Sequence, residues 1–299
     1  MNKTSLLIIG ATVLGTAAAI TSGGDYVLLE EGVTPGWEFV SAFRHRPFGD
    51  IQNSDDQQQV NERGKTQGIN ALQQSGEREE KQGFVGSRQF SEPTKRLYDG
   101  LLRRNCISED GGLHLFPVAG LLASCLLEKP GEVHFSTVVT NIIPKDGGYL
   151  VEASGLDGKM SFWAERILDT TSLGVLHSLA ADCAIQKGLC GMLAGPCEEL
   201  EEEAISIVKG RFDNEYILRL CLPFDTAWPQ ARLALHEAWQ QVWKRFPNCR
   251  FTVSALEYDY EFGAPVAQEV EPGWLWRPSV SCGNLFEAFE GGIQCVTRI

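Results

Sequence analysis

The sequence predicts an α/β fold with a parallel central sheet and a second, strand-rich lobe. Three observations support this prediction. The chain opens with an apolar strand, a glycine turn and a helix of small residues. A second apolar strand follows and ends in an acidic pair, and strand patterns recur between residues 181 and 270. Fully apolar strands are typical of a parallel sheet that is buried on both faces.

The first fifty residues define the opening unit. Ser5–Ile9 is an apolar, partly β-branched strand that ends at Gly10. Ala11–Ile20 has the small and apolar residues of a packed helix, and the glycines after it are typical of a helix C-terminus. Asp25–Gly32 is the second strand with its acidic end. This order of strand, turn, helix and strand predicts a nucleotide-binding unit.

The same opening residues have a second interpretation. Lys3, the apolar run after it and the small residues Ala17–Ala19 are also features of a cleaved secretory signal, which would make this an exported protein. A signal peptide gives no reason for the strand and acidic pair that follow, so the sequence favours the fold interpretation.

The turn after the first strand carries the first candidate cofactor-binding residues. Glu30 follows Gly10 by twenty residues, near the spacing at which a carboxylate meets the ribose hydroxyls of a dinucleotide. The helix N-terminus would offer N–H groups to a pyrophosphate. The turn departs from the G-x-G-x-x-G pattern, because Thr12 replaces the second glycine. Thr12 would either crowd the pyrophosphate or donate a hydrogen bond to it, and a turn that no longer holds a dinucleotide is the third alternative. The candidates are Gly10, Ala11, Thr12, Gly15 and Glu30.

With these residues, the chain resembles the FAD-dependent oxidoreductases whose flavin domain is a Rossmann-like two-dinucleotide-binding fold, with a degenerate glycine motif. Residues 132–142 are similar to the family strand in which a valine backbone contacts adenine, which implies a role for Val139. Residues 164–172 are similar to the D-A-T-G stretch beside the dinucleotide, which implies Asp169 and Thr170, with Ser172 in place of the glycine. Residues 278–293 are similar to the closing flavin-contact segment, which implies Gly283 and Asn284.

The resemblance implies a domain organisation and an activity. A Rossmann-like FAD-binding domain would comprise residues 1–180 and 271–299, and a substrate lobe residues 181–270. The implied cofactor is FAD, and the implied reaction is hydride transfer from a small organic substrate to the flavin. The alternative is a non-catalytic, cofactor-free relative that acts as a binding or scaffold subunit. Thr12 and Ser172 motivate this alternative, as does a polar insert at about residues 50–82.

Two histidines are candidates for proton transfer. They are His45, which lies between two arginines, and His114, which precedes an apolar helix. The basic turn around His45 would bind a phosphate or carboxylate, or it is an exposed turn on an acidic protein. In the second lobe the patterns predict strands over 204–208, 215–222 and 250–260, and a helix over 227–246.

Composition limits the partners and the location. The formal net charge of −13 argues against nonspecific binding of nucleic acid or of anionic membranes. A small-molecule substrate is the partner that the resemblance implies, and oligomerisation stays open. The nine cysteines form no C-x-x-C pair, which predicts reduced thiols in a cytoplasmic protein. Cys183, Cys190 and Cys197 recur every seven residues but lack the close pairing of zinc ligands, so we expect buried thiols and no metal.

Overall fold

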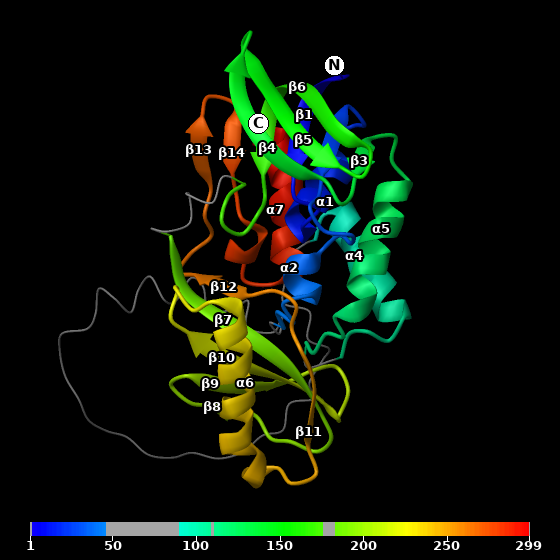
Figure 1. Ribbon diagram of the computed structural model, residues 1–299. Coiled ribbons are helices and arrows are strands. Elements are labelled where there is room, and N and C mark those ends of the chain that lie inside the picture. Colours follow the sequence, from blue (N-terminus) through cyan, green and yellow to red (C-terminus); the bar gives the residue numbers. More distant parts are fainter. Residues whose placement is uncertain (1, 46–89, 109–110, 176–182, 299) are drawn as a thin grey trace, which may run out of the picture.

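The computed structural model describes residues 2–45, 90–108, 111–175 and 183–298. The predicted polar insert at 50–82 lies outside these ranges. Within them the chain forms two sheets, one above the other in Figure 1.

The first sheet is built around parallel strands. Its order is β13-β14-β6-β1-β2-β3, and each neighbouring pair from β14 to β3 is parallel. An antiparallel extension, β4 and β5, continues from the first part of β6. The strands are β1 (Asn2–Ile9), β2 (Tyr26–Leu29), β3 (Glu132–His134), β4 (Val138–Lys145), β5 (Gly148–Gly155), β6 (Gly158–Asp169), β13 (Gln268–Glu271) and β14 (Trp274–Trp276).

Helices cover this sheet, and two of them are packed closely together. Gly292 of the last helix lies against the first helix so tightly that a Cβ there would be 2.1 Å from the carbonyl oxygen of Leu14. Figure 1 shows the first and last helices side by side behind the strands. The helices are α1 (Val13–Thr21), α2 (Trp37–Val40), α4 (Glu92–Arg103), α5 (Phe116–Leu127) and α7 (Leu285–Arg298), and a short 3-10 turn, η3 (Ser279–Ser281), precedes α7.

The second sheet has a long central strand. β7 (Ala184–Ala194) pairs with β10 on one side and with β11 and β12 in succession on the other. Helix α6 (Trp228–Val242) packs on this sheet, and the short turn η2 (Trp243–Arg245) follows it (Figure 1). The remaining strands are β8 (Leu200–Glu201), β9 (Ile205–Lys209), β10 (Glu215–Leu222), β11 (Arg250–Ser254) and β12 (Asp259–Phe262).

The predicted fold class is confirmed: a parallel central sheet stands beside a second, strand-rich sheet. Three details differ. The predicted strand at 132–142 is two strands, because the chain turns at Ser136, where φ is 53°. The predicted strand at 250–260 is also two, β11 and β12. Strand β7 was not predicted, because glycine, lysine and glutamine weaken its strand pattern and its neighbours stabilise it. The domain boundaries stay a prediction.

The opening residues form the central strand of the first sheet, as the fold interpretation predicted. In the described part of the chain, no helix has both the length and the apolar character needed to cross a membrane. All nine cysteines are free thiols; Cys190 is buried, while Cys183 and Cys197 are half-buried.

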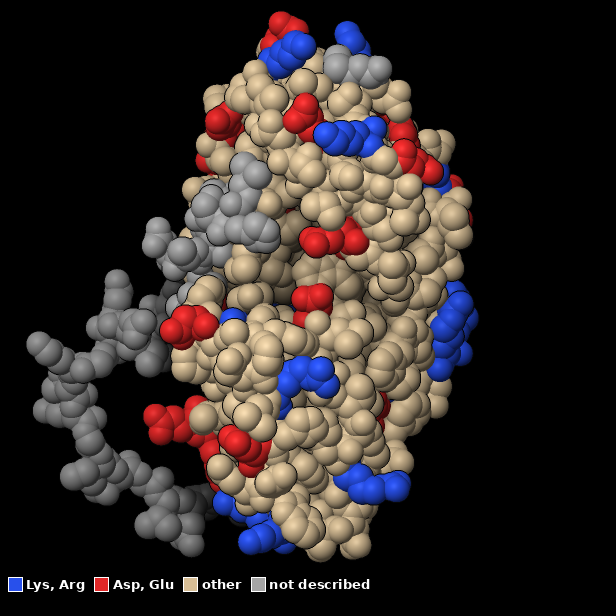
Figure 2. Space-filling model, viewed as in Figure 1, with Lys and Arg blue, Asp and Glu red and all other residues tan. Residues whose placement is uncertain are grey.

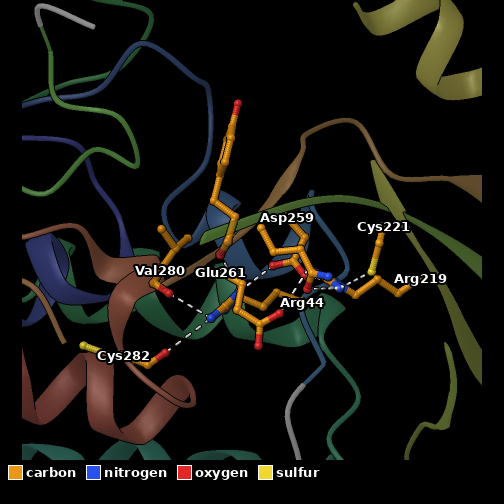
Figure 3. A network of polar contacts seen from close by, with 9 residues as sticks. Arg44, Arg219, Cys221, Asp259, Glu261, Val280 and Cys282 are labelled. Atoms are coloured by element: carbon orange, nitrogen blue, oxygen red, sulfur yellow. Dashed lines mark hydrogen bonds and ion pairs between the residues drawn. The ribbon is translucent and has the colours of Figure 1, made fainter. Parts of the chain in front are cut away.

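A buried ion network joins the second sheet to the segments after α2 and at η3 (Figure 3). Asp259 of β12 accepts hydrogen bonds from Arg44, which follows α2, and from Arg219 of β10, whose Nε lies 2.6 Å away. Arg44 also donates to the carbonyl oxygen of Val280 at 2.8 Å. Arg44 is only 5% exposed, so both interpretations of it, as an exposed basic residue and as a free anion ligand, are wrong.

Candidate functional site: the first glycine turn

Close packing requires glycine at both ends of the turn between β1 and α1. Gly10 has φ 94°, and a Cβ there would lie 2.8 Å from the hydroxyl of Thr170. A Cβ on Gly15 would lie 2.1 Å from the carbonyl oxygen of Gly10. Because a side chain at either position would overlap its neighbours, these two glycines keep the strand and the helix close together.

Thr12 is the N-cap of helix α1. Its hydroxyl accepts a hydrogen bond from the backbone N–H of Gly15 at 2.9 Å. The same hydroxyl donates to Thr170 Oγ1 at 2.7 Å. Its φ of −62° and ψ of 173° are ordinary for an N-cap, so glycine is not needed here in this arrangement.

The resemblance implied Asp169 and Thr170 as cofactor-binding residues. Both lie at the end of β6, where their side chains form hydrogen bonds to the backbone of neighbouring segments. The Thr170 hydroxyl lies 3.0 Å from the carbonyl oxygens of Ile9 and Gly10. Asp169 accepts hydrogen bonds from the N–H groups of Thr171 at 3.0 Å and Val175 at 2.7 Å. Both side chains are fully buried, so they hold the neighbouring loops in place.

Glu30 lies at the tip of β2, where the spacing predicted an acid, and its carboxylate contacts the chain itself. One oxygen accepts from the N–H of Ala11 at 2.6 Å and from the indole N–H of Trp37 at 3.1 Å. The other accepts from the N–H of Gly32 at 2.6 Å. Burial raises the pKa of Glu30, and these hydrogen bonds oppose that rise.

Glu38 of α2 is a site residue that the sequence analysis missed. Its side chain is 1% exposed, and Oε1 accepts hydrogen bonds from the N–H of Val13 at 2.7 Å and from the Ser279 hydroxyl at 2.6 Å. Ser279 in turn accepts from the N–H of Leu14 at 3.3 Å. Burial raises the pKa of Glu38 to about 7. No local pattern points to this residue, because only the packing of α2 against α1 brings it to the turn.

The N–H groups around the start of α1 are therefore bonded within the chain. Four acceptor side chains satisfy them: Glu30 for Ala11, Glu38 for Val13, Ser279 for Leu14 and Thr12 for Gly15.

The N–H groups at the start of α7 are also hydrogen-bonded to side chains of the chain itself. Asn284 Oδ1 accepts from the N–H groups of Phe286 at 3.0 Å and Glu287 at 3.1 Å. Gly283 donates its N–H to the carboxylate of Glu287 at 3.1 Å. Gly283 and Asn284 thus lie where the loop meets the helix. Val139 lies in β4, where its side chain is buried in the hydrophobic core.

The two candidate histidines belong to segments that lie side by side. His45 Nε2 accepts a hydrogen bond from the N–H of Leu113 at 3.0 Å, and its ring is buried. His114 directly follows Leu113 in the chain. Its Nδ1 lies 2.8 Å from a carboxylate oxygen of Glu215 on β10. This second contact joins the first lobe to the second sheet. Proton transfer by either histidine stays a prediction.

The surface between the two lobes is hollowed, and acidic side chains lie in and beside the hollow (Figure 2). Two carboxylates from different segments, Glu31 after β2 and Glu257 before β12, are near enough to interact. Burial raises the pKa of Glu257, and the charge of Glu31 raises it further. The acidic side chains that Figure 2 shows around the hollow disfavour the entry of an anionic ligand there.

No family model matches the sequence, and no curated protein does. Solved structures do match the fold. The crystal structure of glycine oxidase from Geobacillus kaustophilus has a TM-score of 0.59 at 14% identity, covering 100% of this chain and 95% of that one. The p-nitrophenol 4-monooxygenase PnpA from Pseudomonas putida DLL-E4 has a TM-score of 0.58 at 13% identity, covering 99% and 78%.

A third structure is a geranylgeranyl bacteriochlorophyll reductase-like protein from Thermoplasma acidophilum. It has a TM-score of 0.61 at 10% identity and covers 99% of this chain and 78% of that one. The chain has the fold of the FAD-binding flavoproteins. At these identities the likeness shows the fold alone.

The residues of the turn, as they are arranged here, do not fit the diphosphate of FAD. A diphosphate bound at a helix start needs N–H groups that are free to donate. The N–H of Val13 is held by Glu38, and that of Leu14 by Ser279.

Proposed function

We propose that this chain uses the flavoprotein fold without bound FAD, as a non-catalytic binding protein. The observation that carries the proposal is the Glu38 carboxylate, which lies 2.7 Å from the N–H of Val13 at the start of α1. In a dinucleotide-binding fold a phosphate accepts hydrogen bonds at the start of this helix, so the Glu38 carboxyl group would compete with it for the N–H of Val13.

Electrostatics adds to the steric argument. Two like unit charges 4 Å apart repel by about 4 kcal/mol in an environment typical of a protein surface. A diphosphate at the turn would meet the carboxyl group of Glu38, which is 1% exposed. FAD would have to displace or neutralise this group before it bound.

The first test is the absorbance spectrum of the purified protein. We expect no flavin bands and no change in melting temperature when FAD is added, because a ligand that binds only the folded state would raise that temperature. Protein that purifies with stoichiometric flavin would overturn the proposal.

The second test removes the side chains that occupy the N–H groups of the turn. Glu38→Ser removes the carboxylate, and combining it with Thr12→Gly restores the glycine pattern. We expect the double variant to gain measurable affinity for ADP, a simple diphosphate probe, in calorimetry. Glu152→Ser, which removes an exposed carboxylate from β5, is the matched control and should gain none. If the double variant folds and still ignores ADP, the carboxylate is not what excludes the diphosphate.

The second candidate is an FAD-dependent oxidoreductase that transfers a hydride from a small organic substrate. Two observations favour it: the tight packing of Gly10 and Gly15, and the position of Glu30 at the tip of β2. The names of the similar structures, an oxidase, a monooxygenase and a reductase-like protein, support it as well. Yellow protein that is bleached by a substrate under anaerobic conditions would favour this candidate over the first.

A further inference from the structure

The second lobe carries an open groove between helix α6 and strand β11. Its volume is about 530 Å³. The helix contributes Trp228, Arg232 and His236, and the strand side contributes residues 251–256. The Phe251 ring lies 4.8 Å from the His236 ring, centroid to centroid, so aromatic and basic groups are interleaved along the groove.

The groove is basic on a protein that is acidic overall. Arg232 and His236 are the only ionisable residues that line it among the described residues, while the chain has a net charge of −13. They are four residues apart on α6, so they lie on one face of the helix, and both are exposed. The acidic residues nearest in sequence, Glu237 and Glu257, do not line the groove. Its charge is therefore complementary to a carboxylate ligand.

The strand side of the groove offers unused hydrogen-bonding groups. Over the described ranges, β11 pairs with β7 alone, which leaves its outer edge without a partner strand. Ser254 is 9% exposed, lines the groove, and makes no side-chain hydrogen bond within the part of the chain that the structure describes. A free strand edge is the surface to which an extended peptide adds as a further strand.

We propose that this groove binds an extended, acidic peptide segment of a partner protein. The segment lies along the outer edge of β11, and alternate side chains project toward α6 because side chains alternate between the faces of a strand. Carboxylates on that face meet Arg232 and His236. The proposal names the partner for the binding role proposed above, and it rests on that role.

Binding is tested with a fluorescent synthetic peptide of about seven residues in which glutamate and valine alternate, a length typical of a strand. We expect anisotropy to show binding that weakens with salt, and no binding of the counterpart in which lysine replaces glutamate. Arg232→Glu should weaken binding about tenfold or more, since it replaces an attraction with a repulsion. Arg103→Glu makes the same charge change on the exposed face of α4 and should have no effect.

Hydrogen exchange identifies the binding mode. We expect the amides of Arg250–Ser254 that point away from β7 to become protected when the peptide binds, because an added strand pairs with the free edge. Four outcomes would overturn the proposal. Two concern affinity: no binding at about 1 mM peptide, or equal binding by Arg232→Glu. The other two concern the binding mode: peptide binding without protection of β11, or a dimer in light scattering in which the outward-facing β11 amides are already protected. The last would make a second copy of the chain the occupant. FAD titration of the same protein is independent, so flavin binding would remove the cofactor-free proposal and leave the peptide result intact.

Discussion

The start of α1 and the groove beside α6 differ in their polar groups. Those at the start of α1 form hydrogen bonds within the chain, and those of the groove are free to bind a partner. At the start of α1 the chain's own side chains accept the hydrogen bonds of Ala11, Val13, Leu14 and Gly15. In the groove the two basic side chains are exposed and the edge of β11 has no partner among the described strands. The hydrogen-bonding groups at the turn with the glycine pattern are thus occupied, while those of the groove, which carries no sequence motif, are free in the part of the chain that the structure describes. A likeness of fold locates a site, but the free polar groups decide whether it binds.

Buried and exposed charges also differ in how much they contribute to the free energy of unfolding. A buried charge that loses its partner costs several kcal/mol, whereas an exposed charge is solvated and contributes little to stability. Substitution of a buried, paired charge should therefore change the free energy of unfolding about ten times more than substitution of an exposed charge.

The largest effect is expected at the junction between the lobes. Asp259→Ala leaves the guanidinium groups of Arg44 and Arg219 buried without their shared carboxylate. We expect a loss of about 3–5 kcal/mol in the free energy of unfolding, measured in urea. Glu261→Ala is the control, since Glu261 is a more exposed partner of Arg219 at 3.3 Å, and should cost about 1 kcal/mol or less. Equal losses in the two variants would show that burial does not set the cost.

The next effect depends on pH and concerns Glu38. Its pKa rises from 4.5 to about 7 in the folded state. The folded protein therefore binds more protons than the unfolded chain between these values, and its stability falls as pH rises through this window. Glu38→Gln removes the titration. We expect it to equal the wild type near pH 4.5 and to exceed it above pH 7 by up to about 3 kcal/mol.

The measurement for Glu38 is the melting temperature across that pH range. Glu201→Gln, at an exposed position on β8, is the matched control and should follow the wild-type curve. A Glu38→Gln curve that runs parallel to the wild type would show that Glu38 does not titrate in this window.

A smaller effect is expected from the cap of α1. Thr12→Ala removes the acceptor of the Gly15 N–H and should lower the free energy of unfolding by about 1–2 kcal/mol. Thr140→Ala, on the exposed side of β4, is the control and should change it by less than about 0.5 kcal/mol. No loss in Thr12→Ala would mean that water replaces the hydroxyl at the turn.

The smallest effect is expected in the groove. Arg232→Glu should alter the free energy of unfolding by no more than about 0.5 kcal/mol, because Arg232 is exposed and has no ion-pair partner among the described residues. Thermal unfolding would measure this. A large loss would place Arg232 in the structural framework and would weaken the contrast between the two regions.

The sequence predicted elements whose signal is local. Ser5–Ile9 is apolar throughout, Gly10 ends it, and the strand, turn and helix lie where the pattern placed them. β7 escaped prediction because its stability comes from neighbours on both sides. The sequence did not predict Glu38 as a site residue for a similar reason. Its carboxylate reaches the turn, 25 residues earlier in the chain, only because α2 packs beside α1.

By itself the sequence determined the class of fold, the two glycines that allow β1 and α1 to approach, and the acid at the tip of β2. These features follow from apolar periodicity, backbone freedom and short spacing, which are properties of adjacent residues. Only the tertiary structure decided whether the turn is open. Glu38 and Ser279 are 241 residues apart, and their hydrogen bond at the start of α1 exists because α2 and η3 fold against the same helix.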